Sequence, residues 1–383
     1  MAFEIPPISN EEKEAVWQAY RDRRPTRVPV VLGTNSRVIV LNEKLNTRRR
    51  TFAQVFSDPA VMLEVMLDHL YYCHTVLHQY CDWPVGLPKE WTLSPFWLNV
   101  YEAAFFGAPV QFRPGQIPDT EPFLGDQNKN AIFDVDLDGV LERGIFRKGL
   151  DFAEKMKELA ARQDFHGRPV KISRFVNAGT DGPLTVAINL RGPAFLEDLV
   201  LDEEYAGKLM AFLVEAVIRR MHAFRKFYGD ETIWPGYFAD DAIQLISAEM
   251  YRRQVLPHHR RFFQATWPAD VERNIHLCGN VLRHMKTVRQ ELNVTSFDTG
   301  FPVDFARMRQ ELGEDVEIYG GPPISLLLSG KPQEVYDTTC RILASGIKAG
   351  GRFVLREGNN LPPCVPEANL AAMYKACLDE GKY

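Results

Sequence analysis

The chain alternates short apolar runs with longer segments of helical periodicity, and this alternation limits its possible folds more than any other feature. An apolar run that ends at Gly33 predicts a strand at 28–32, and a second strand is expected near 98–101. Further strands are expected at 168–172, 233–237, 273–277, 294–297, 316–319 and 352–355. Eight strands that are mostly followed by helices are typical of a closed parallel barrel. The predicted fold class is therefore α/β, a (β/α)8 TIM barrel.

Two segments stand outside this alternation. Residues 10–24 have a helical pattern with acidic residues in the first turn, so residues 1–27 are predicted to be an N-terminal helical extension. The stretch 107–147 is rich in Gly, Pro, Asp and Asn, which favours an insertion that includes a hairpin over a domain linker. We therefore expect one barrel domain over residues 1–383.

Composition excludes several classes of protein. Charged residues make up 25% of the chain, the net charge is −5, and acidic and basic residues are mixed, so the basic face that nucleic-acid binding needs is not expected. The N-terminus has no signal-peptide pattern, and no apolar run is long enough to span a membrane. The six cysteines include no CxxC pair, which favours free thiols. These features predict a cytoplasmic protein without nucleic-acid or membrane partners.

Polar residues collect where the predicted strands end, which is where barrel enzymes place their active sites. The residues at these ends are Asn35, Arg37, Glu102, Asn177, Asp181, Asp240, Asp241, His276, Cys278, Asp298, Glu357, Asn359 and Asn360. Loops are polar in any fold, and this alone explains about half of the set. We expect the remainder to face a common pocket at the barrel mouth.

The segment 273–280 carries the sharpest signal. Residues two apart in a strand point to the same side, so His276 and Cys278 can both face the barrel mouth and bind a soft metal, most readily Zn²⁺. A catalytic zinc needs about three protein ligands. Candidates for the third are Glu357, Cys364, Asp298 and Asp240. The alternative is a hydrogen-bonded histidine beside a small buried cysteine.

A second group of potential ligands falls on one predicted helix. His69 and Cys73 are four residues apart, as are His74 and His78. Such spacing can hold a metal, but the two pairs face different sides of the helix. Ordinary helix packing is the favoured interpretation of these four residues.

Several segments together carry a family resemblance. His276-Leu-Cys-Gly279 matches an HxCG zinc motif, Gly179–Ala187 is similar to a GPF-type segment, and the stretches 240–247 and 350–369 add matching pieces in the same order. The chain resembles the uroporphyrinogen decarboxylase superfamily, and within it the corrinoid-dependent methyltransferases. The resemblance is good over 170–383 and weak before that. It implies a (β/α)8 barrel and favours metal binding by His276 and Cys278.

The resemblance also has a departure. In the methylcobamide:coenzyme M branch the third zinc ligand is a cysteine in the loop after the last strand, and that position is Asn359 here, with Cys364 five residues further on. The metal site is therefore predicted to comprise His276, Cys278 and Glu357, with Cys364 as a further candidate. Asp298 is another candidate ligand, and the alternative that the site binds no metal stays open.

The leading functional hypothesis is a corrinoid-dependent methyltransferase of the O-demethylating kind. It would move a methyl group from a small donor, preferably a methoxylated aromatic, to Co(I) of a separate corrinoid protein, because the chain has no DxHxxG cobalamin motif of its own. A methyl ether needs its leaving oxygen protonated or bound to a Lewis acid, and Asp240, Asp298 and Glu357 are the candidate catalytic acids or further ligands. The predicted substrate-binding residues are Asn35, Arg37, Trp97, Tyr101, Glu102, Tyr237, Asp241 and Asn359.

Two other classes remain open. One is a metal-free decarboxylase or other lyase, although the loop after the first strand holds only Arg37 where a polycarboxylate substrate would call for several arginines. The other is a non-catalytic binding relative that kept the barrel. A homodimer is also kept open as an assembly.

Overall fold

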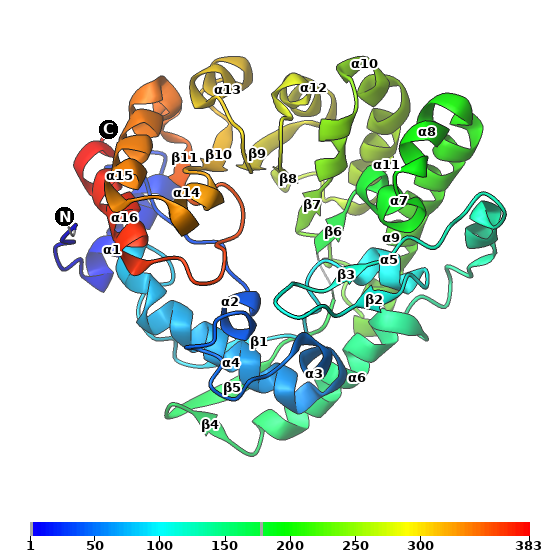
Figure 1. The fold of residues 1–383 in the computed structure, drawn as a ribbon, viewed down its shortest axis with the longest axis horizontal. Coiled ribbons are helices and arrows are strands. Elements are labelled where there is room, and N and C mark those ends of the chain that lie inside the picture. Colours follow the sequence, from blue (N-terminus) through cyan, green and yellow to red (C-terminus); the bar gives the residue numbers. More distant parts are fainter. Residues whose placement is uncertain (1–2, 177–178) are drawn as a thin grey trace.

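A ring of parallel strands surrounded by helices forms the molecule (Figure 1). The computed structural model describes residues 3–176 and 179–383. Six parallel strands are hydrogen-bonded in the order β11-β10-β9-β8-β7-β6. Their bounds are β6 Gly179–Asp181, β7 Tyr237–Ala239, β8 Arg273–Leu277, β9 Val294–Thr299, β10 Glu317–Gly320 and β11 Phe353–Leu355.

The rest of the ring is made by shorter pairings. Val30 forms a parallel bridge with Leu355 of β11, and Val31 forms one with Trp83. β1 (Trp91–Leu93) pairs in parallel with β5 (Arg168–Ile172), while β4 (Asp164–Phe165) adds an antiparallel turn to β5. Because β5 pairs with β1 and β6 pairs with β7, β5 and β6 together fill one position of the ring. Eight positions result, and the predicted (β/α)8 barrel is confirmed.

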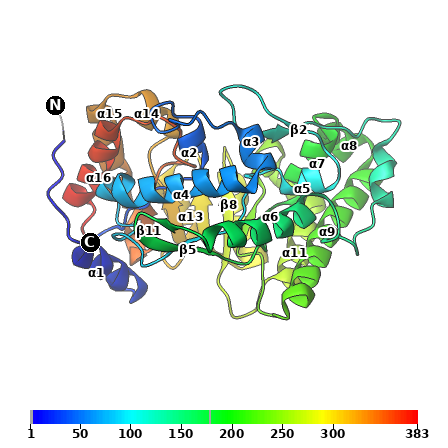
Figure 2. The same ribbon diagram turned by 90° about the horizontal axis from the view of Figure 1, so that it is seen from below.

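The helices lie outside the strands, as barrel architecture requires. They are α1 Asn10–Arg21, α2 Arg37–Val40, α3 Phe52–Ser57, α4 Pro59–Thr75, α5 Tyr101–Phe105, α6 Gly144–Ala160, α7 Pro183–Arg191, α8 Ala194–Leu201, α9 Glu203–Tyr228, α10 Ala248–Met250, α11 Leu256–Thr266, α12 Leu282–Leu292, α13 Phe305–Leu312, α14 Ile324–Ser329, α15 Pro332–Ile342 and α16 Glu367–Glu380. Figure 2 shows α2, α14 and β2 toward the same end of the molecule, where strands give way to loops. Within the described ranges no helix is long and apolar enough to cross a bilayer.

Local sequence signals account for the helix starts. The Asp58 carboxylate accepts from the Ala60 amide with Pro59 at the first helical position of α4, and the Asp202 carboxylate caps α9. The insertion at 107–147 contains the predicted hairpin, formed by β2 (Val110–Gln111) and β3 (Asp119–Thr120). α6 already begins at Gly144, inside the predicted insertion.

Two strand predictions were wrong. No strand forms near 98–101, because Leu98 adopts a left-handed φ of 54° and α5 begins at Tyr101; the strand lies earlier, at β1. The strand predicted at 233–237 begins only at Tyr237. In each case a short apolar or glycine-containing run did not specify which residues would pair.

Buried Asp82 ties together three distant parts of the chain. Its carboxylate accepts two bonds of 2.7 Å from the Arg27 guanidinium, one of 2.8 Å from the Val30 amide and one of 2.6 Å from the Tyr374 hydroxyl. Arg27 and Val30 belong to the first strand position of the ring, at residues 27–31, and Tyr374 belongs to α16. The contacts of Asp82 therefore close the ring where neighbouring strand positions are joined only by single bridges. Removing one partner of a buried ion pair strongly destabilises the folded state, because the other charge is left buried without a partner.

We predict that Asp82→Ala lowers the free energy of unfolding by about 3–5 kcal/mol, because it leaves the Arg27 charge buried without a counter-charge. Urea denaturation followed by circular dichroism measures this. Asp315→Ala, which removes an exposed partner of Arg289, is the matched control and should cost under about 1 kcal/mol. A loss below about 1 kcal/mol for Asp82→Ala would contradict the role of this contact.

Candidate active site

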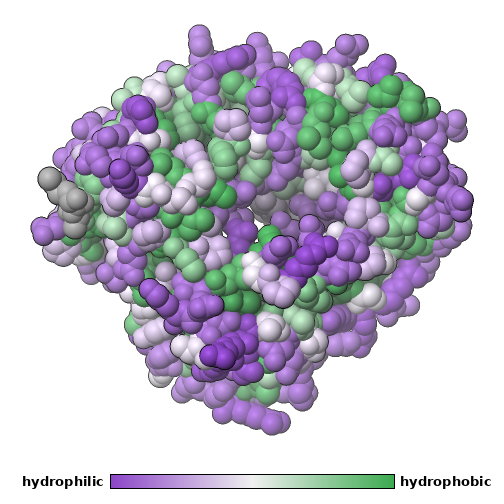
Figure 3. All heavy atoms as spheres, viewed as in Figure 1, coloured by the Kyte–Doolittle hydropathy of each residue, from purple (hydrophilic) through white to green (hydrophobic). Residues whose placement is uncertain are grey.

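A cavity of about 730 Å³ lies at the carboxyl ends of the strands. The space-filling view looks into a hollow at the centre of the ring (Figure 3). The sequence-derived residues that line the cavity are Asn35, Tyr101, Glu102, Asp181, Tyr237, His276, Asp298 and Asn360. The structure therefore brings together residues from the first loop, α5, β7, β8 and β9. Asn177 of the sequence-derived set lies outside the described residues.

The parallel register of β7, β8 and β9 places the candidate ligands together. Ala239 pairs with His276, and His276 pairs with Asp298. Two residues beyond Ala239, the Asp241 carboxylate accepts a 2.7 Å hydrogen bond from the Cys278 amide. Potential ligand atoms of Asp241, His276 and Cys278 all lie within 4.8 Å of one another. Asp241, predicted to bind substrate, is thus the third member of a possible metal site.

Contacts of the His276 imidazole leave one nitrogen for a metal. Nδ1 lies 2.8 Å from Asp298 Oδ2, while Nε2 lies 3.0 Å from Cys278 Sγ and 4.0 Å from Asp241 Oδ1. A carboxylate that holds the second ring nitrogen of a ligating histidine is a common feature of zinc sites. Imidazole, thiolate and carboxylate are all zinc ligands, and three of them leave a fourth position open. The donor set therefore fits Zn²⁺.

Charges around Asp298 keep it ionised. Burial alone would raise the pKa of Asp298, but the Arg356 guanidinium at 2.8 Å and His276 bring that pKa below its ordinary value. Burial would lower the pKa of His276, whereas hydrogen bonds with Asp298 and Cys278 raise it well above its ordinary value. Asp298 thus orients the imidazole and is a poor source of protons.

Glu357 does not join Asp241, His276 and Cys278 in the possible metal site. Its fully buried carboxylate accepts from the Gly33 amide at 3.0 Å and from the Arg356 guanidinium at 2.7 Å. Burial raises its pKa to about 7 against the opposing effect of Arg356. The cavity is lined by Arg356 but not by Glu357, because the arginine shields the carboxylate. The predicted ligand and catalytic roles of Glu357 are replaced by a role in holding Arg356 and the first loop.

Asp240 is also placed away from the cavity. Its fully buried carboxylate accepts from the Thr185 amide at 2.8 Å and the Thr185 hydroxyl at 2.6 Å, and contacts His259 Nε2 at 2.7 Å. These contacts fix the start of α7. The predicted catalytic role of Asp240 is corrected to a structural one, because its carboxylate contacts residues of α7 and α11 and does not line the cavity.

Four further predicted residues lie outside the cavity. Trp97 is a core side chain that packs on Phe152. Arg37 and Asn359 line a separate surface pocket, and the Asn359 carbonyl accepts from Arg356 at 2.7 Å. Cys364 is exposed and its Sγ lies 3.8 Å from the Leu41 carbonyl. Neither Asn359 nor Cys364 completes the metal group.

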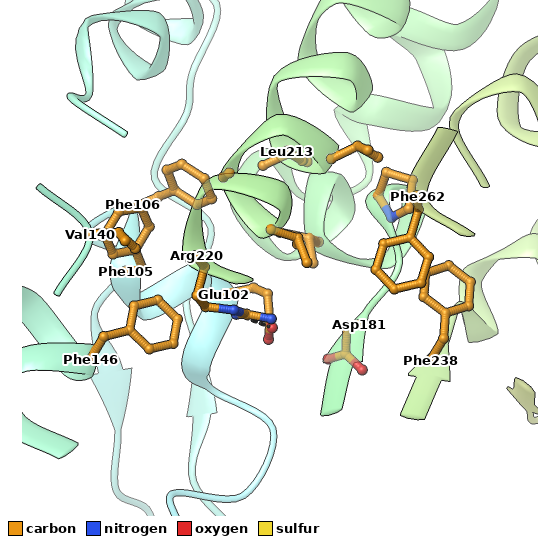
Figure 4. A pocket seen from close by; sticks show the side chains of 15 residues that line it. Glu102, Phe105, Phe106, Val140, Phe146, Asp181, Leu213, Arg220, Phe238 and Phe262 are labelled. Atoms are coloured by element: carbon orange, nitrogen blue, oxygen red, sulfur yellow. Dashed lines mark hydrogen bonds and ion pairs between the residues drawn. The ribbon is translucent and has the colours of Figure 1, made fainter. Parts of the chain in front are cut away.

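Asp181, one of the strand-end polar residues of the sequence analysis, lines the cavity, although no catalytic or ligand role was predicted for it. It ends β6 and also lines a second pocket, where it faces the ion pair between Arg220 and Glu102, whose nitrogen and oxygen are 2.8 Å apart (Figure 4). Burial, and then Glu102, Asp241 and Asp240, raise the pKa of Asp181 well above its ordinary value. Its place directly before Gly182-Pro183, at a strand end, was the available signal. Asp181 is therefore a carboxyl group suited to stay protonated at the cavity wall.

The raised pKa of Glu357 predicts a pH-dependent stability. The folded state holds a proton that the unfolded state releases near pH 4.5, so this contribution is complete below about pH 4.5 and is lost as pH rises to 7. Wild type should lose about 3 kcal/mol relative to Glu357→Gln across that window, measured by urea unfolding at about pH 4.5, 5.5, 6.5 and 7.5. Parallel pH profiles of the two proteins would disprove the assignment.

This chain is similar to known proteins in both sequence and structure. A 137-residue segment is 33% identical to the methylated-thiol–coenzyme M methyltransferase of Methanosarcina mazei; the match covers 35% of this chain and about a third, 34%, of that relative's length. A solved structure, a methyltransferase from Methanosarcina mazei, superposes over 97% of this chain and 99% of its own, with a TM-score of 0.64 and 16% identity. This likeness establishes the shared fold.

A second solved structure is more distant. A B12-independent methionine synthase from Shewanella sp. W3-18-1 in complex with selenomethionine covers 60% of this chain and 66% of its own at 14% identity, and its TM-score of 0.32 is too low to indicate a shared fold. Residues 169–379, which are more than half of the chain, match the uroporphyrinogen decarboxylase (URO-D) family. The chain belongs to the uroporphyrinogen decarboxylase family.

Proposed function

We propose that this protein is a methyltransferase that moves a methyl group from a small methylated donor, a methoxylated aromatic in our preferred form, to the Co(I) of a separate corrinoid protein. The observation that carries the proposal is the group of Asp241, His276 and Cys278, whose ligand atoms lie within 4.8 Å of one another beside the cavity. The similarity to a methylated-thiol–coenzyme M methyltransferase supports the same class of reaction. In this reaction the corrinoid protein is a second substrate, which accepts the methyl group.

Asp241, His276 and Cys278 would hold a zinc ion. A bound Zn²⁺ supplies Lewis acidity toward a donor oxygen or sulfur atom. The chain's own contribution is to orient the site: Asp298 holds the imidazole through Nδ1, and Arg356 keeps Asp298 ionised. A thiolate ligand also suits the reducing cytoplasm that the sequence predicts, and the described cysteines are all free.

Asp181 is the group we assign to proton transfer. As the bond between the methyl carbon and the donor oxygen breaks, the bonding pair stays on oxygen, and the Asp181 proton joins it. The methyl carbon meanwhile bonds to cobalt through the electron pair of Co(I). Asp181 is left as a carboxylate that water must reprotonate. A carboxyl group with a raised pKa at a partly dry cavity wall suits this role.

Decarboxylation of a polycarboxylate is less well supported. Arg174 and Arg356 are the arginines among the described residues that line the cavity, and each is already paired with carboxylates: Arg174 with Asp230, Arg356 with Asp298 and Glu357. Arg37, the first residue of α2, lines a different pocket. A substrate with several carboxylates would find little free positive charge in this cavity.

The assembly of the protein into a homodimer stays a prediction.

We predict that purified protein binds about one zinc ion per chain and that His276→Ala, Cys278→Ala and Asp241→Asn each lose it, because each removes a ligand. Elemental analysis after dialysis measures the content. Asp298→Asn should weaken zinc affinity by about tenfold to a hundredfold. Cys364→Ala and Glu357→Gln are the controls and should retain zinc. Retention in Cys278→Ala, or loss in Cys364→Ala, would refute this ligand set.

We predict that Asp181→Asn lowers kcat of methyl transfer to free cob(I)alamin by about a hundredfold or more with 4-methoxyphenol, because the amide cannot donate the required proton readily. With 4-methoxynitrobenzene, whose leaving phenoxide is stable without protonation, the loss should be much smaller. Methylcobalamin absorbance gives the rates, and Asp119→Asn on exposed β3 is the control. Equal losses with both donors would rule out proton donation by Asp181.

A further inference from the structure

Three uncharged polar side chains form a cluster on the cavity wall opposite the candidate metal group. Thr34 Oγ1 lies 2.9 Å from His69 Nε2 and 3.3 Å from Cys73 Sγ, and that sulfur lies 3.4 Å from the same imidazole nitrogen. Thr34 and His69 line the cavity. Thr34 follows the first strand position and the other two residues lie on α4, so the polar cluster joins two elements.

The strand order shows that the polar cluster and the metal group face each other. The first strand position adjoins β11, and the hydrogen-bonded order from there is β11-β10-β9-β8. β8 is therefore four positions from the first strand in a ring of eight, which is the opposite side of a closed barrel. A ligand that spans the cavity would have one end near Cys278 and the other near Thr34.

The polar cluster is uncharged. Burial lowers the pKa of His69 to about 4, so the imidazole is neutral near pH 7. Burial likewise raises the pKa of Cys73 to about 11, with a smaller opposing effect of its hydrogen bond to Thr34. A carboxylate brought to this wall would lose its hydration, which is costly, and Arg356, which lies against Gly33, is already paired with Asp298 and Glu357.

Hydrogen-bonding capacity remains on Thr34. A hydroxyl offers one donor and two acceptor positions, and His69 and Cys73 occupy two of these three. One position is left toward the cavity that Thr34 lines. Aromatic walls lie between the two ends, since Phe96, Tyr101 and Tyr237 line the same space. The cavity thus offers an uncharged hydrogen-bonding end and an aromatic middle.

We infer that Thr34 and His69 form a subsite that binds a neutral hydroxyl or carbonyl group at the end of the methyl donor remote from its methyl group. The inference rests on the proposed function for the direction of the donor, with the methyl group at the Cys278 end. It narrows the donor class to aromatic methyl ethers that carry an uncharged polar substituent. Donors that end in a carboxylate are disfavoured by the same wall.

Titration calorimetry on the zinc-supplemented protein tests this without any corrinoid. We expect 4-methoxyphenol to bind more tightly than methoxybenzene and 4-methoxybenzoate. Thr34→Val and His69→Leu should each weaken 4-methoxyphenol binding by about tenfold, the value of one good hydrogen bond, and change methoxybenzene binding less than about twofold. Thr34→Ser should restore binding, and Thr338→Val on outer helix α15 should leave it unchanged.

The outcomes separate this inference from the proposed function. Equal weakening for 4-methoxyphenol and methoxybenzene, or tightest binding of 4-methoxybenzoate, would overturn the neutral subsite. No binding of 4-methoxyphenol by a folded wild-type protein would overturn it as well. Selective binding of 4-methoxyphenol without methylcobalamin formation would instead leave the subsite standing and remove the methyltransferase proposal. Circular dichroism of each variant distinguishes lost binding from lost fold.

Discussion

The site depends on the parallel register of β7, β8 and β9. Because Ala239, His276 and Asp298 lie side by side across the three strands, residues that follow them by two positions also become neighbours. Asp241 and Cys278 meet in this way through the 2.7 Å bond from amide to carboxylate. A slip of one residue in either pairing would turn these side chains to the opposite face of the sheet. The close approach of Asp241, His276 and Cys278 is thus a consequence of sheet geometry.

A series of contacts between ionisable side chains links His276 to the contacts that close the barrel. Asp298 contacts His276 on one side and Arg356 on the other, and Arg356 continues to Glu357, which accepts from the Gly33 amide. The last strand, the first loop and the candidate metal ligand are therefore coupled through three ionisable side chains. The contacts of Asp82 secure the same seam nearer to the amino ends of the strands. The interactions that orient His276 also help to close the ring.

The cavity has two chemically different walls. Charged groups gather around β8, β9 and β11, where Arg356 and Asp298 stand beside the ligand group. Neutral groups lie on the α4 side, where burial keeps His69 uncharged. Electrostatic interactions are strongest in a partly dry site. The two walls would therefore orient a donor according to the charge and polarity of its two ends. This division favours a donor with a reactive methyl group at one end and a neutral polar group at the other.

Local sequence was enough to specify the alternation of strands and helices, the caps at Asp58 and Asp202, and the pairing of His276 with Cys278, because each is set by periodicity or by neighbours a few residues away. Which acid joins this pair depends on the tertiary structure. Asp240 and Asp241 are adjacent in sequence, yet one is sealed against α7 and the other faces the ligand group. Likewise, Glu357 lies behind Arg356, and Leu98 with its left-handed backbone ends the predicted strand. These outcomes depend on contacts between segments far apart in the chain, which a local pattern does not encode.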